Sequence, residues 1–292
     1  LYQGIQGRHY RLPTEQDYEA VWKAKKRLSA ILDEWERGGR KGLCPVPDES
    51  LPPIGTLGFR VQRYGMLQWG DLFTVRQKMA ITTLIRALPT GDTAAFRPLL
   101  AFAVSKQSDF NSSLSRWANH MEKSVATFGR QALPILWDWG EVVPTSNASG
   151  AFDVAVDWIA NAAATIQEMC QLKGQVQIAD ACESPLPDET SGLWFTDPPY
   201  YDAIPYSDLS DYFLVWLKRS MPGTLLLGDP YDSNNPLSPK TREAVQDESR
   251  VVDGRPKDRA FFEETMAKAF ADGKRVLRVD GVGAVVFAHK TT

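Results

Sequence analysis

Residues 193–206 read LWFTDPPYYDAIPY, and this stretch decides how the second half of the chain is interpreted. A short apolar run ends in Asp197, Pro198, Pro199 and Tyr200. Proline has a fixed φ and no N–H, so the two prolines end a strand and hold the acid and the aromatic ring at its tip. The stretch therefore predicts a strand that leads directly into a functional site.

The residue types at this tip match a planar ring that carries an exocyclic amino group. The neighbours of Pro198 and Pro199 keep carbonyl oxygens free to accept hydrogen bonds, and Asp197 adds a carboxylate beside them. Tyr200 offers a flat face on which such a ring stacks. An amine held in this way attacks an electrophilic methyl group directly, with orientation and electrostatics supplying the acceleration. In duplex DNA the base must first be flipped out of the stack.

Strands and helices alternate after residue 134, which indicates a parallel sheet covered by helices. We expect strands at residues 133–139, 174–181, 192–196 and 281–290, and helices at residues 151–171, 207–219 and 257–277. Residues 220–256, rich in Pro, Gly, Asp and Asn, form a long excursion. Asp180 and Asp197 both lie at carboxyl ends of predicted strands, where ligands sit in such sheets.

The first half of the chain is expected to be mostly helical. Residues 14–36 have helical periodicity and begin at Thr14 with Asp17 at the third helical position, and Thr74 with Gln77 predicts a second capped helix. Residues 44–58 are a Pro/Gly-rich loop, residues 59–66 a short strand or arm, and residues 94–132 mostly helix with a break near 109–117. These patterns divide the chain into a helical accessory region, 1–133, and an α/β core, 134–292.

Composition excludes several classes of protein. The 292 residues carry a net charge of −3, so nucleic-acid contacts must come from local patches. Basic clusters at 23–27, 37–41 and 254–259 are more often solvated faces than phosphate contacts. Three cysteines without a C-x-x-C pair, together with three histidines, indicate no metal site. We expect a cytoplasmic protein with no membrane span.

Residues 196–219, TDPPYYDAIPYSDLSDYFLVWLKR, resemble the catalytic motif of amino-group DNA methyltransferases. More narrowly, they resemble the large adenine-specific DNA methylases that carry an internal zinc ribbon. Further segments resemble the same family: GRHYRLPTEQD at 7–17, LGFRVQRYGMLQWGDLFTVRQ at 57–77, NSSLSRW at 111–117, FGRQALPILWDWGEVVP at 128–144 and RVLRVDGVGAVVFAHKTT at 275–292. The resemblance thus runs along most of the chain, in separate segments.

The resemblance implies a Rossmann-like methyltransferase sheet, S-adenosyl-L-methionine as the methyl donor and the N6 amino group of adenine in DNA as the acceptor. Carried over by position, the catalytic residues are Asp197, Pro198, Pro199 and Tyr200. Asp180 matches the acid that contacts the cofactor adenine in such enzymes, with capping of the next turn as the alternative, and Phe73 and Thr74 loosely resemble the segment that flanks the cofactor. Tyr201, Asp202 and Tyr206 are expected to form the rim of the base pocket, with loop packing as the alternative. No metal is implied, and further subunits of a modification or defence system are expected partners.

The chain departs from the family pattern in two places. The glycine-rich cofactor loop, Asp-Pro-Phe-x-Gly-x-Gly, is absent, and in the family it precedes every segment quoted above. We therefore expect a C-terminal-side fragment with an incomplete sheet that is not assumed to be active alone. Residues 137–144, WDWGEVVP, also have valines where an Asn-Pro pair is expected.

Several alternatives remain open at this point. Cytosine N4 presents the same kind of amine as adenine N6. Related proline motifs serve enzymes that methylate RNA adenine or protein glutamine. A non-catalytic binding module of a larger complex is the alternative from another class. Cytosine C5 methylation needs a Pro-Cys loop, which this sequence does not contain, so Cys182 is not expected to be a nucleophile.

Overall fold

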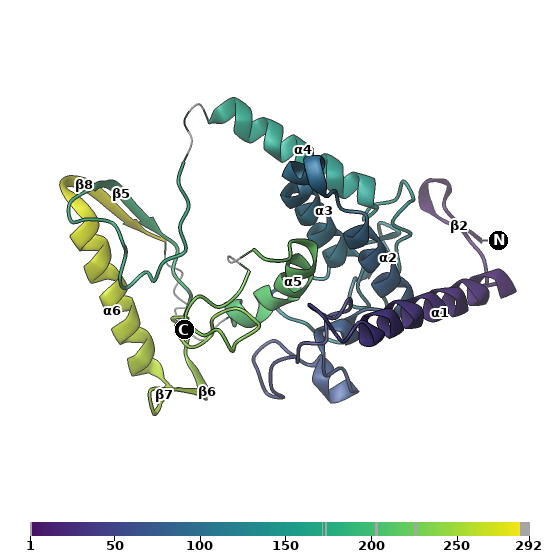
Figure 1. Ribbon diagram of the computed structural model, residues 1–292, viewed down its shortest axis with the longest axis horizontal. Helices are drawn as coiled ribbons and strands as arrows, with labels where there is room; N and C mark the ends of the chain where they lie inside the picture. The colour runs from purple at the N-terminus through teal and green to yellow at the C-terminus, as the bar shows by residue number, and fades with distance from the viewer. Residues whose placement is uncertain (1, 171, 173, 202–203, 225–226, 287–292) are drawn as a thin grey trace. The chain divides into compact units, whose positions relative to one another are not determined.

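The computed structural model describes residues 2–170, 172, 174–201, 204–224 and 227–286 (Figure 1). The chain divides into two compact units. Unit 1 consists of Leu1–Gln171 and Ser210–Leu227, and unit 2 consists of Leu172–Leu209 and Gly228–Thr292. The boundary expected between residues 133 and 134 lies inside unit 1, and the division between the units also falls within a helix, between Leu209 and Ser210.

Unit 1 is mostly helical, as the sequence predicts. Its helices are α1 (Glu15–Arg37), α2 (Val75–Arg86), α3 (Arg97–Phe110), α4 (Phe152–Met169) and most of α5 (Tyr206–Ser220), with 3-10 turns η1 (Ile5–Gly7), η2 (Val61–Tyr64), η3 (Trp69–Leu72) and η4 (Gly91–Phe96). Two antiparallel pairs, β1 (Tyr2–Gln3) with β2 (His9–Tyr10) and β3 (Trp117–Ala118) with β4 (Lys123–Ser124), complete it. No helix in the described residues is long and apolar enough to cross a membrane.

The predicted helix starts are confirmed because the capping side chains make the expected bonds. The Thr14 N–H donates to Asp17 Oδ2 at 2.7 Å at the start of α1. At the start of α2 the Gln77 N–H donates to Thr74 Oγ1 at 3.3 Å, and the Thr74 N–H donates to Gln77 Oε1 at 2.9 Å. These reciprocal bonds satisfy N–H groups that no helical carbonyl reaches.

The helix expected to resume after the break in 94–132 does not form, because hydroxyl groups take over the backbone. The Ser112 N–H donates to Ser115 Oγ, and the Leu114 N–H donates to Ser112 Oγ, each at 3.0 Å. Ser112 Oγ also lies 2.8 Å from Thr127 Oγ1, across the following turn. Local side-chain bonds of this kind compete with helical bonds.

Two expected strands are also absent, and residues 59–66, expected to be a short strand or arm, form no strand. Residues 59–66 contain the 3-10 turn η2, and residues 133–139 form only isolated bridges, Phe59 with Leu133 and Arg116 with Trp139. In the stretch 174–181 only Asp180 forms a bridge, with Glu183, and Val176 is 97% exposed. An alternating sequence becomes a strand only where a neighbouring strand supplies its hydrogen bonds.

The core of unit 1 is aromatic and is built around α5. Tyr212 and Trp216 are fully buried and contact Phe73 at ring-centroid distances of 5.6 and 5.2 Å. Trp69 and Phe128 meet the Tyr212 ring edge-on. The Tyr212 hydroxyl donates to the Ser108 carbonyl at 2.7 Å, and burial raises the pKa of this phenol.

A buried arginine fixes the last turn of α5 to the Pro-rich loop 44–49. Arg219 Nε donates to the Cys44 carbonyl at 2.6 Å, Nη1 to Glu49 Oε1 at 3.0 Å and to the Val215 carbonyl at 2.7 Å, and Nη2 to the Val46 carbonyl and to Asp48 Oδ1, both at 3.2 Å. Lys218 Nζ shares the same Glu49 oxygen at 3.0 Å. Burial alone would raise the pKa of Glu49, but the two cations lower it below its usual range.

Unit 2 contains a parallel strand pair covered on one face by a helix. Strand β5 (Ser191–Thr196) pairs with β8 (Leu277–Val285), and α6 (Arg259–Val276) leads directly into β8. Trp194 packs edge-on against Phe270 of α6, and a Cβ at Gly273 would collide with the Trp194 ring. An antiparallel hairpin of β6 (Asp247–Val252) and β7 (Arg255–Lys257) lies within and just after the predicted excursion.

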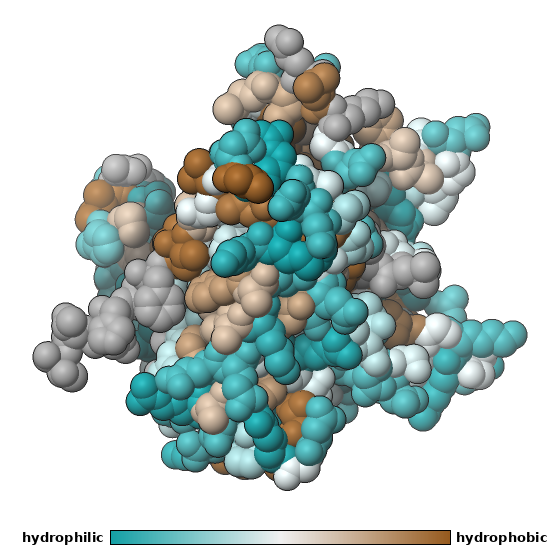
Figure 2. Space-filling view, turned by 90° about the vertical axis from the view of Figure 1, so that its left-hand side faces the viewer, coloured by the Kyte–Doolittle hydropathy of each residue, from teal (hydrophilic) through white to brown (hydrophobic). Residues whose placement is uncertain are grey.

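The other face of the parallel pair is bare among the described residues. Leu193, Phe195 and Val282 are 61%, 64% and 62% exposed. Brown, apolar residues also reach the surface of the molecule in Figure 2. Parallel sheets are normally buried on both faces, so this pair has the character of a part of a larger sheet. The predicted mixture of helix and strand is confirmed, while the Rossmann-like arrangement stays a prediction.

We expect Glu49→Ala to lower the free energy of unfolding by roughly 3 kcal/mol, because Lys218 and Arg219 then lose their shared carboxylate in the interior. Asp48→Ala is the matched control. Asp48 also pairs with Arg219, but its side chain is 51% exposed, and an exposed pair contributes less than about 1 kcal/mol. Urea denaturation measures the free energy of unfolding of both variants. Equal losses of stability would contradict a special role of Glu49 in holding the last turn of α5.

Candidate functional site

The Asp-Pro-Pro motif stands at the carboxyl end of β5, as the sequence predicts. Strand β5 ends at Thr196, whose carbonyl accepts a hydrogen bond from the Val286 N–H at 2.9 Å. The Asp197 side chain is exposed, while Pro198 is buried beneath it. The strand pairing therefore fixes the backbone up to the motif, and the proline ring holds the carboxylate at the surface of unit 2.

Tyr200 turns its hydroxyl back to the acid of the motif. The Tyr200 hydroxyl donates to Asp197 Oδ1 at 2.9 Å. This bond, together with partial desolvation, raises the pKa of Tyr200. Asp197 is thus oriented by its own motif, and within the described residues no donor bonds its second carboxylate oxygen.

Tyr201 and Tyr206 follow this acid along the chain and have different surroundings. Tyr201 adopts a left-handed backbone with φ 43°, which is strained for a non-glycine residue. Its ring meets Phe262 edge-on at 5.3 Å, and its carbonyl accepts from the Gln246 N–H at 3.0 Å. Tyr206 is 37% exposed at the first position of α5, and burial is the main cause that raises its pKa. Asp202 lies outside the described residues.

A pocket of about 660 Å³ opens beside the motif, entirely within unit 2. Its lining comes from residues 177–199, from the loop 231–244 and from α6. Asp180, Asp197, Pro198 and Pro199 all line it, so the structure brings the two predicted acids into one pocket. The volume falls within the range of about 300–1,000 Å³ typical of small-molecule sites.

Arg242 holds Asp180 on the wall of this pocket. Arg242 Nη1 lies 2.8 Å from Asp180 Oδ2, and its guanidinium stacks 4.3 Å from the centroid of the Tyr231 ring. Asp180 Oδ1 accepts from the Cys182 N–H at 2.8 Å. Burial by itself would raise the pKa of Asp180, but the Cys182 and Arg242 bonds together lower it. Sequence reasoning missed Arg242, because nothing in the polar excursion signals which of its residues faces the pocket.

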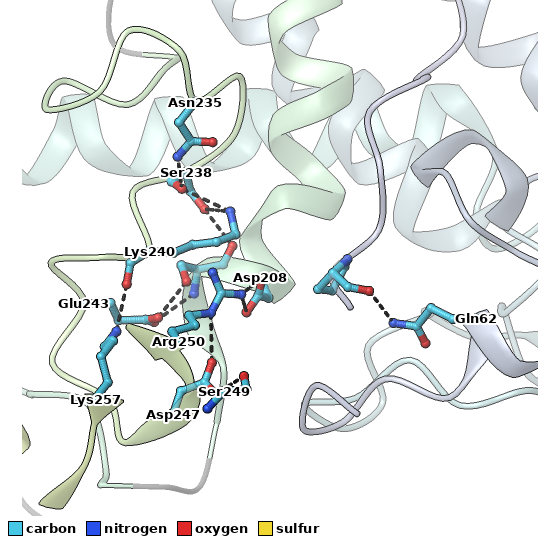
Figure 3. A network of polar contacts seen from close by, with 12 residues as sticks. Gln62, Asp208, Asn235, Ser238, Lys240, Glu243, Asp247, Ser249, Arg250 and Lys257 are labelled. Atoms are coloured by element: carbon cyan, nitrogen blue, oxygen red, sulfur yellow. Dashed lines mark hydrogen bonds and ion pairs between the residues drawn. The ribbon is translucent and has the colours of Figure 1, made fainter. Parts of the chain in front are cut away.

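The first turn of α5, directly after the motif, is fixed by the same excursion. Ser207 donates through its N–H and its hydroxyl to the two oxygens of Glu243, at 2.9 and 2.6 Å. Arg250 lies between Asp208 and Asp247, bonding Asp208 at 2.8 Å and Asp247 at 2.8 Å (Figure 3). The helix expected at residues 207–219 begins one residue earlier, at Tyr206, and the carboxylate of Glu243 lies at its N-terminus.

A buried lysine tightens this network further. Lys257 is 1% exposed, and its Nζ donates to the Lys240 carbonyl at 2.8 Å (Figure 3). Burial is the main cause that lowers the pKa of Lys257. The residues around Lys240 are therefore held against the β6–β7 hairpin, which keeps the neighbouring Arg242 and Glu243 at the site.

Phe73 and Thr74, the other two residues assigned to the cofactor, lie in unit 1 and do not line this pocket. Phe73 is 3% exposed within the aromatic core. Thr74 caps α2, and its hydroxyl donates to Glu141 Oε1 at 2.5 Å. Both residues have structural contacts that account for them, and their cofactor role stays a prediction.

Within the described residues no group of His, Cys, Asp and Glu side chains is arranged to hold a metal ion. No protein-family model, no curated protein and no solved structure matches the chain. The function must therefore be argued from the chemistry of the pocket and the motif.

The three cysteines are expected to differ sharply in reactivity. Burial is the main cause that raises the pKa of both Cys44 and Cys182, and the Asp180 charge raises that of Cys182 further. Cys170 is exposed. Iodoacetamide near neutral pH should therefore label Cys170 first, since the thiolate is the reactive form.

Asp180→Asn should accelerate labelling of Cys182 several-fold by removing the neighbouring negative charge, while Cys170 and Cys44 serve as internal references. Peptide mass spectrometry over time measures all three rates. Labelling of Cys182 as fast as Cys170 in the unaltered chain would contradict the arrangement of the pocket.

Proposed function

We propose that the chain is part of an S-adenosyl-L-methionine-dependent DNA methyltransferase that acts on the N6 amino group of adenine. The observation that carries the proposal is the placement of Asp197: an exposed carboxylate at a strand tip, on the rim of a 660 Å³ pocket that also contains Asp180. The resemblance of residues 196–219 to amino-methyltransferases supports the same conclusion.

The described residues fit both reactants. One Asp197 oxygen is engaged by Tyr200, which leaves the other to accept a hydrogen from the amino group of the base. The carbonyl oxygens beside Pro198 and Pro199 would supply a second acceptor. Proline has no N–H, so the backbone at these positions is not part of a regular hydrogen-bonded ladder. Asp180 on the pocket wall is a carboxylate suited to the hydroxyl or amino groups of the cofactor.

When bound, S-adenosyl-L-methionine supplies an electrophilic methyl group on a positively charged sulfur. Asp197 would accept hydrogens of the amino group and so orient the nitrogen lone pair toward the methyl donor. The methyl group would pass to the nitrogen while the carbon–sulfur electron pair stays on sulfur, and Asp197 or water would take the surplus proton. Tyr201 and Tyr206 would frame a flipped base.

The fold expected for such an enzyme is a Rossmann-like sheet, of which β5 and β8 would be two adjacent strands. Parallel pairing, α6 as the crossover into β8, and the motif at the carboxyl edge of β5 support this assignment. Cytoplasmic localisation and partnership with other subunits of a modification or defence system remain part of the proposal.

A non-catalytic binding module is the second candidate. It is favoured by two observations: the described parallel sheet has only two strands, and the sequence contains no glycine-rich cofactor loop. The two candidates differ in whether the pocket binds the methyl donor at all, which a titration decides.

We expect Asp197→Ala to reduce methyl transfer at least about a hundredfold, the usual effect of removing one group that stabilises the transition state. Asp232→Ala, which changes an exposed acid that does not line the pocket, should retain activity. Transfer of tritiated methyl groups to DNA, RNA and protein substrates in parallel measures the effect and separates the acceptors. Full activity of Asp197→Ala would refute the assignment, and label only in RNA or protein would change the acceptor.

Calorimetric titration with S-adenosyl-L-methionine should give saturable binding to the pocket. Asp180→Ala should weaken that binding about tenfold, since a charge-assisted hydrogen bond contributes roughly 1.5–3 kcal/mol. Circular dichroism provides the check that the variant is folded. Absence of binding to the unaltered chain would favour the non-catalytic module.

A further inference from the structure

Two exposed aromatic rings stand together on the surface of unit 1. Trp137 is 86% exposed and Tyr64 is 59% exposed, with ring centroids 6.4 Å apart and planes at 82°. Exposing this much aromatic surface is unfavourable unless the rings meet something. Neither residue belongs to the pocket of unit 2 or to the motif that the proposed reaction uses.

Three arginines lie on the two segments that carry these rings. Tyr64 ends the turn η2, which Gly65 terminates with φ 85°, a conformation that glycine adopts readily. Arg60 and Arg63 lie on or next to the same turn, and the Arg60 N–H donates to the Leu133 carbonyl at 3.3 Å. Arg130 lies on the segment that leads into Leu133. The side chains of these three arginines are exposed.

These arginines differ from those of unit 2 in having no carboxylate partner among the described residues. Arg242, Arg250 and Arg255 of unit 2 each pair with an acid at 2.8 Å or less. Arg60 bonds only a carbonyl, that of Phe59, at 3.0 Å. In a chain with a net charge of −3, this is a local surplus of positive charge. Asp138, next to Trp137, is the acid closest in sequence to the two rings.

The Trp137 ring also differs from the other strongly exposed indoles. Lys106 lies 4.0 Å from the centroid of Trp158, and Lys25 lies 5.4 Å from that of Trp22. The described contact of Trp137 is the edge-on one with Tyr64, which leaves an indole face open to stack.

We propose that Tyr64, Trp137, Arg60, Arg63 and Arg130 form a platform that binds a single DNA strand. A base stacks on Trp137, and the arginines contact the flanking phosphates. The proposal rests on the proposed function for the choice of DNA as the polymer, and it goes beyond it by assigning a strand-binding surface to unit 1. Surplus positive charge around an open indole fits a polyanion with stacked rings better than an apolar protein surface.

The test uses the full chain and a fluorescein-labelled single DNA strand. Its length of about 16 nucleotides is the largest number that one single-strand-binding domain of known type covers. Anisotropy at low salt should show saturable binding. Trp137→Ala should weaken it at least about fivefold, the lower end of the contribution of one stacked base, and Trp137→Phe should restore part of the loss. Trp158→Ala is the matched control and should stay within about twofold, because Lys106 already covers that ring.

Salt dependence separates the rings from the charges. Arg63→Ala should reduce the slope of log affinity against log salt by about 0.7, the value for one phosphate contact on a single strand. Trp137→Ala should leave that slope unchanged, and Asp138→Asn should raise the affinity. Blunt duplex DNA of the same sequence should bind more weakly, since its bases are already stacked.

Three outcomes would overturn the platform: no binding by the unaltered chain, equal losses in Trp137→Ala and Trp158→Ala, or an unchanged salt slope in Arg63→Ala. Each is independent of methyl transfer. If Asp197→Ala keeps full transfer activity while Trp137→Ala loses DNA binding, the proposed function fails and the platform stands. The reverse pair of results leaves the methyltransferase proposal intact and removes the platform.

Discussion

The burial of charge at both ends of α5 is the constraint on which the rest of the structure depends. An arginine has five N–H donors and cannot lose its charge inside a protein. The five acceptors described around Arg219 are carbonyls of Cys44, Val46 and Val215 and carboxylates of Asp48 and Glu49. Because all of these acceptors must reach the same guanidinium group, Arg219 fixes one arrangement of the loop 44–49 against the helix. Removing a buried partner such as Glu49 leaves a desolvated charge without its counter-charge.

The first turn of α5 follows the same logic within unit 2. Asp208 is 2% exposed and pairs with Arg250, while both oxygens of Glu243 receive hydrogen bonds from Ser207. Ser207 and Asp208 lie ten and eleven residues after Asp197. The excursion that supplies Arg250 and Glu243 therefore also fixes the start of the helix that follows the motif. β5 fixes the backbone before it through its pairing with β8. The motif is thus held on both sides by interactions that leave the Asp197 carboxylate itself exposed.

What the sequence predicted well was local. Thr14 and Thr74 predict helix starts because a cap and its partner lie three residues apart. The prolines that follow Thr196 and Asp197 predict a strand end. What it missed depends on distant partners. Residues 174–181 alternate like a strand, yet no described strand lies beside them, and Arg242 reaches Asp180 from 62 positions along the chain. The serines after Phe110 show a third case, in which hydroxyls compete with the backbone and end a helical pattern.

The pairing of the arginines also bears on how the two units would divide the work of an enzyme on DNA. In the basic cluster at 254–259, Arg255 pairs with Glu264 and Arg259 pairs with Glu263. The positive charge of this cluster is therefore largely neutralised by acids of unit 2. A neutralised arginine releases few counterions from a phosphate backbone, because it must first give up its carboxylate. Arg60, Arg63 and Arg130 of the proposed platform have no carboxylate partner among the described residues. In the proposed enzyme, the reaction at the base would need a carboxylate, whereas binding of the DNA strand would need cations without acidic partners. If these groups lay close together they would pair with one another, as Arg242 pairs with Asp180. Separate surfaces for the two tasks would avoid such pairing.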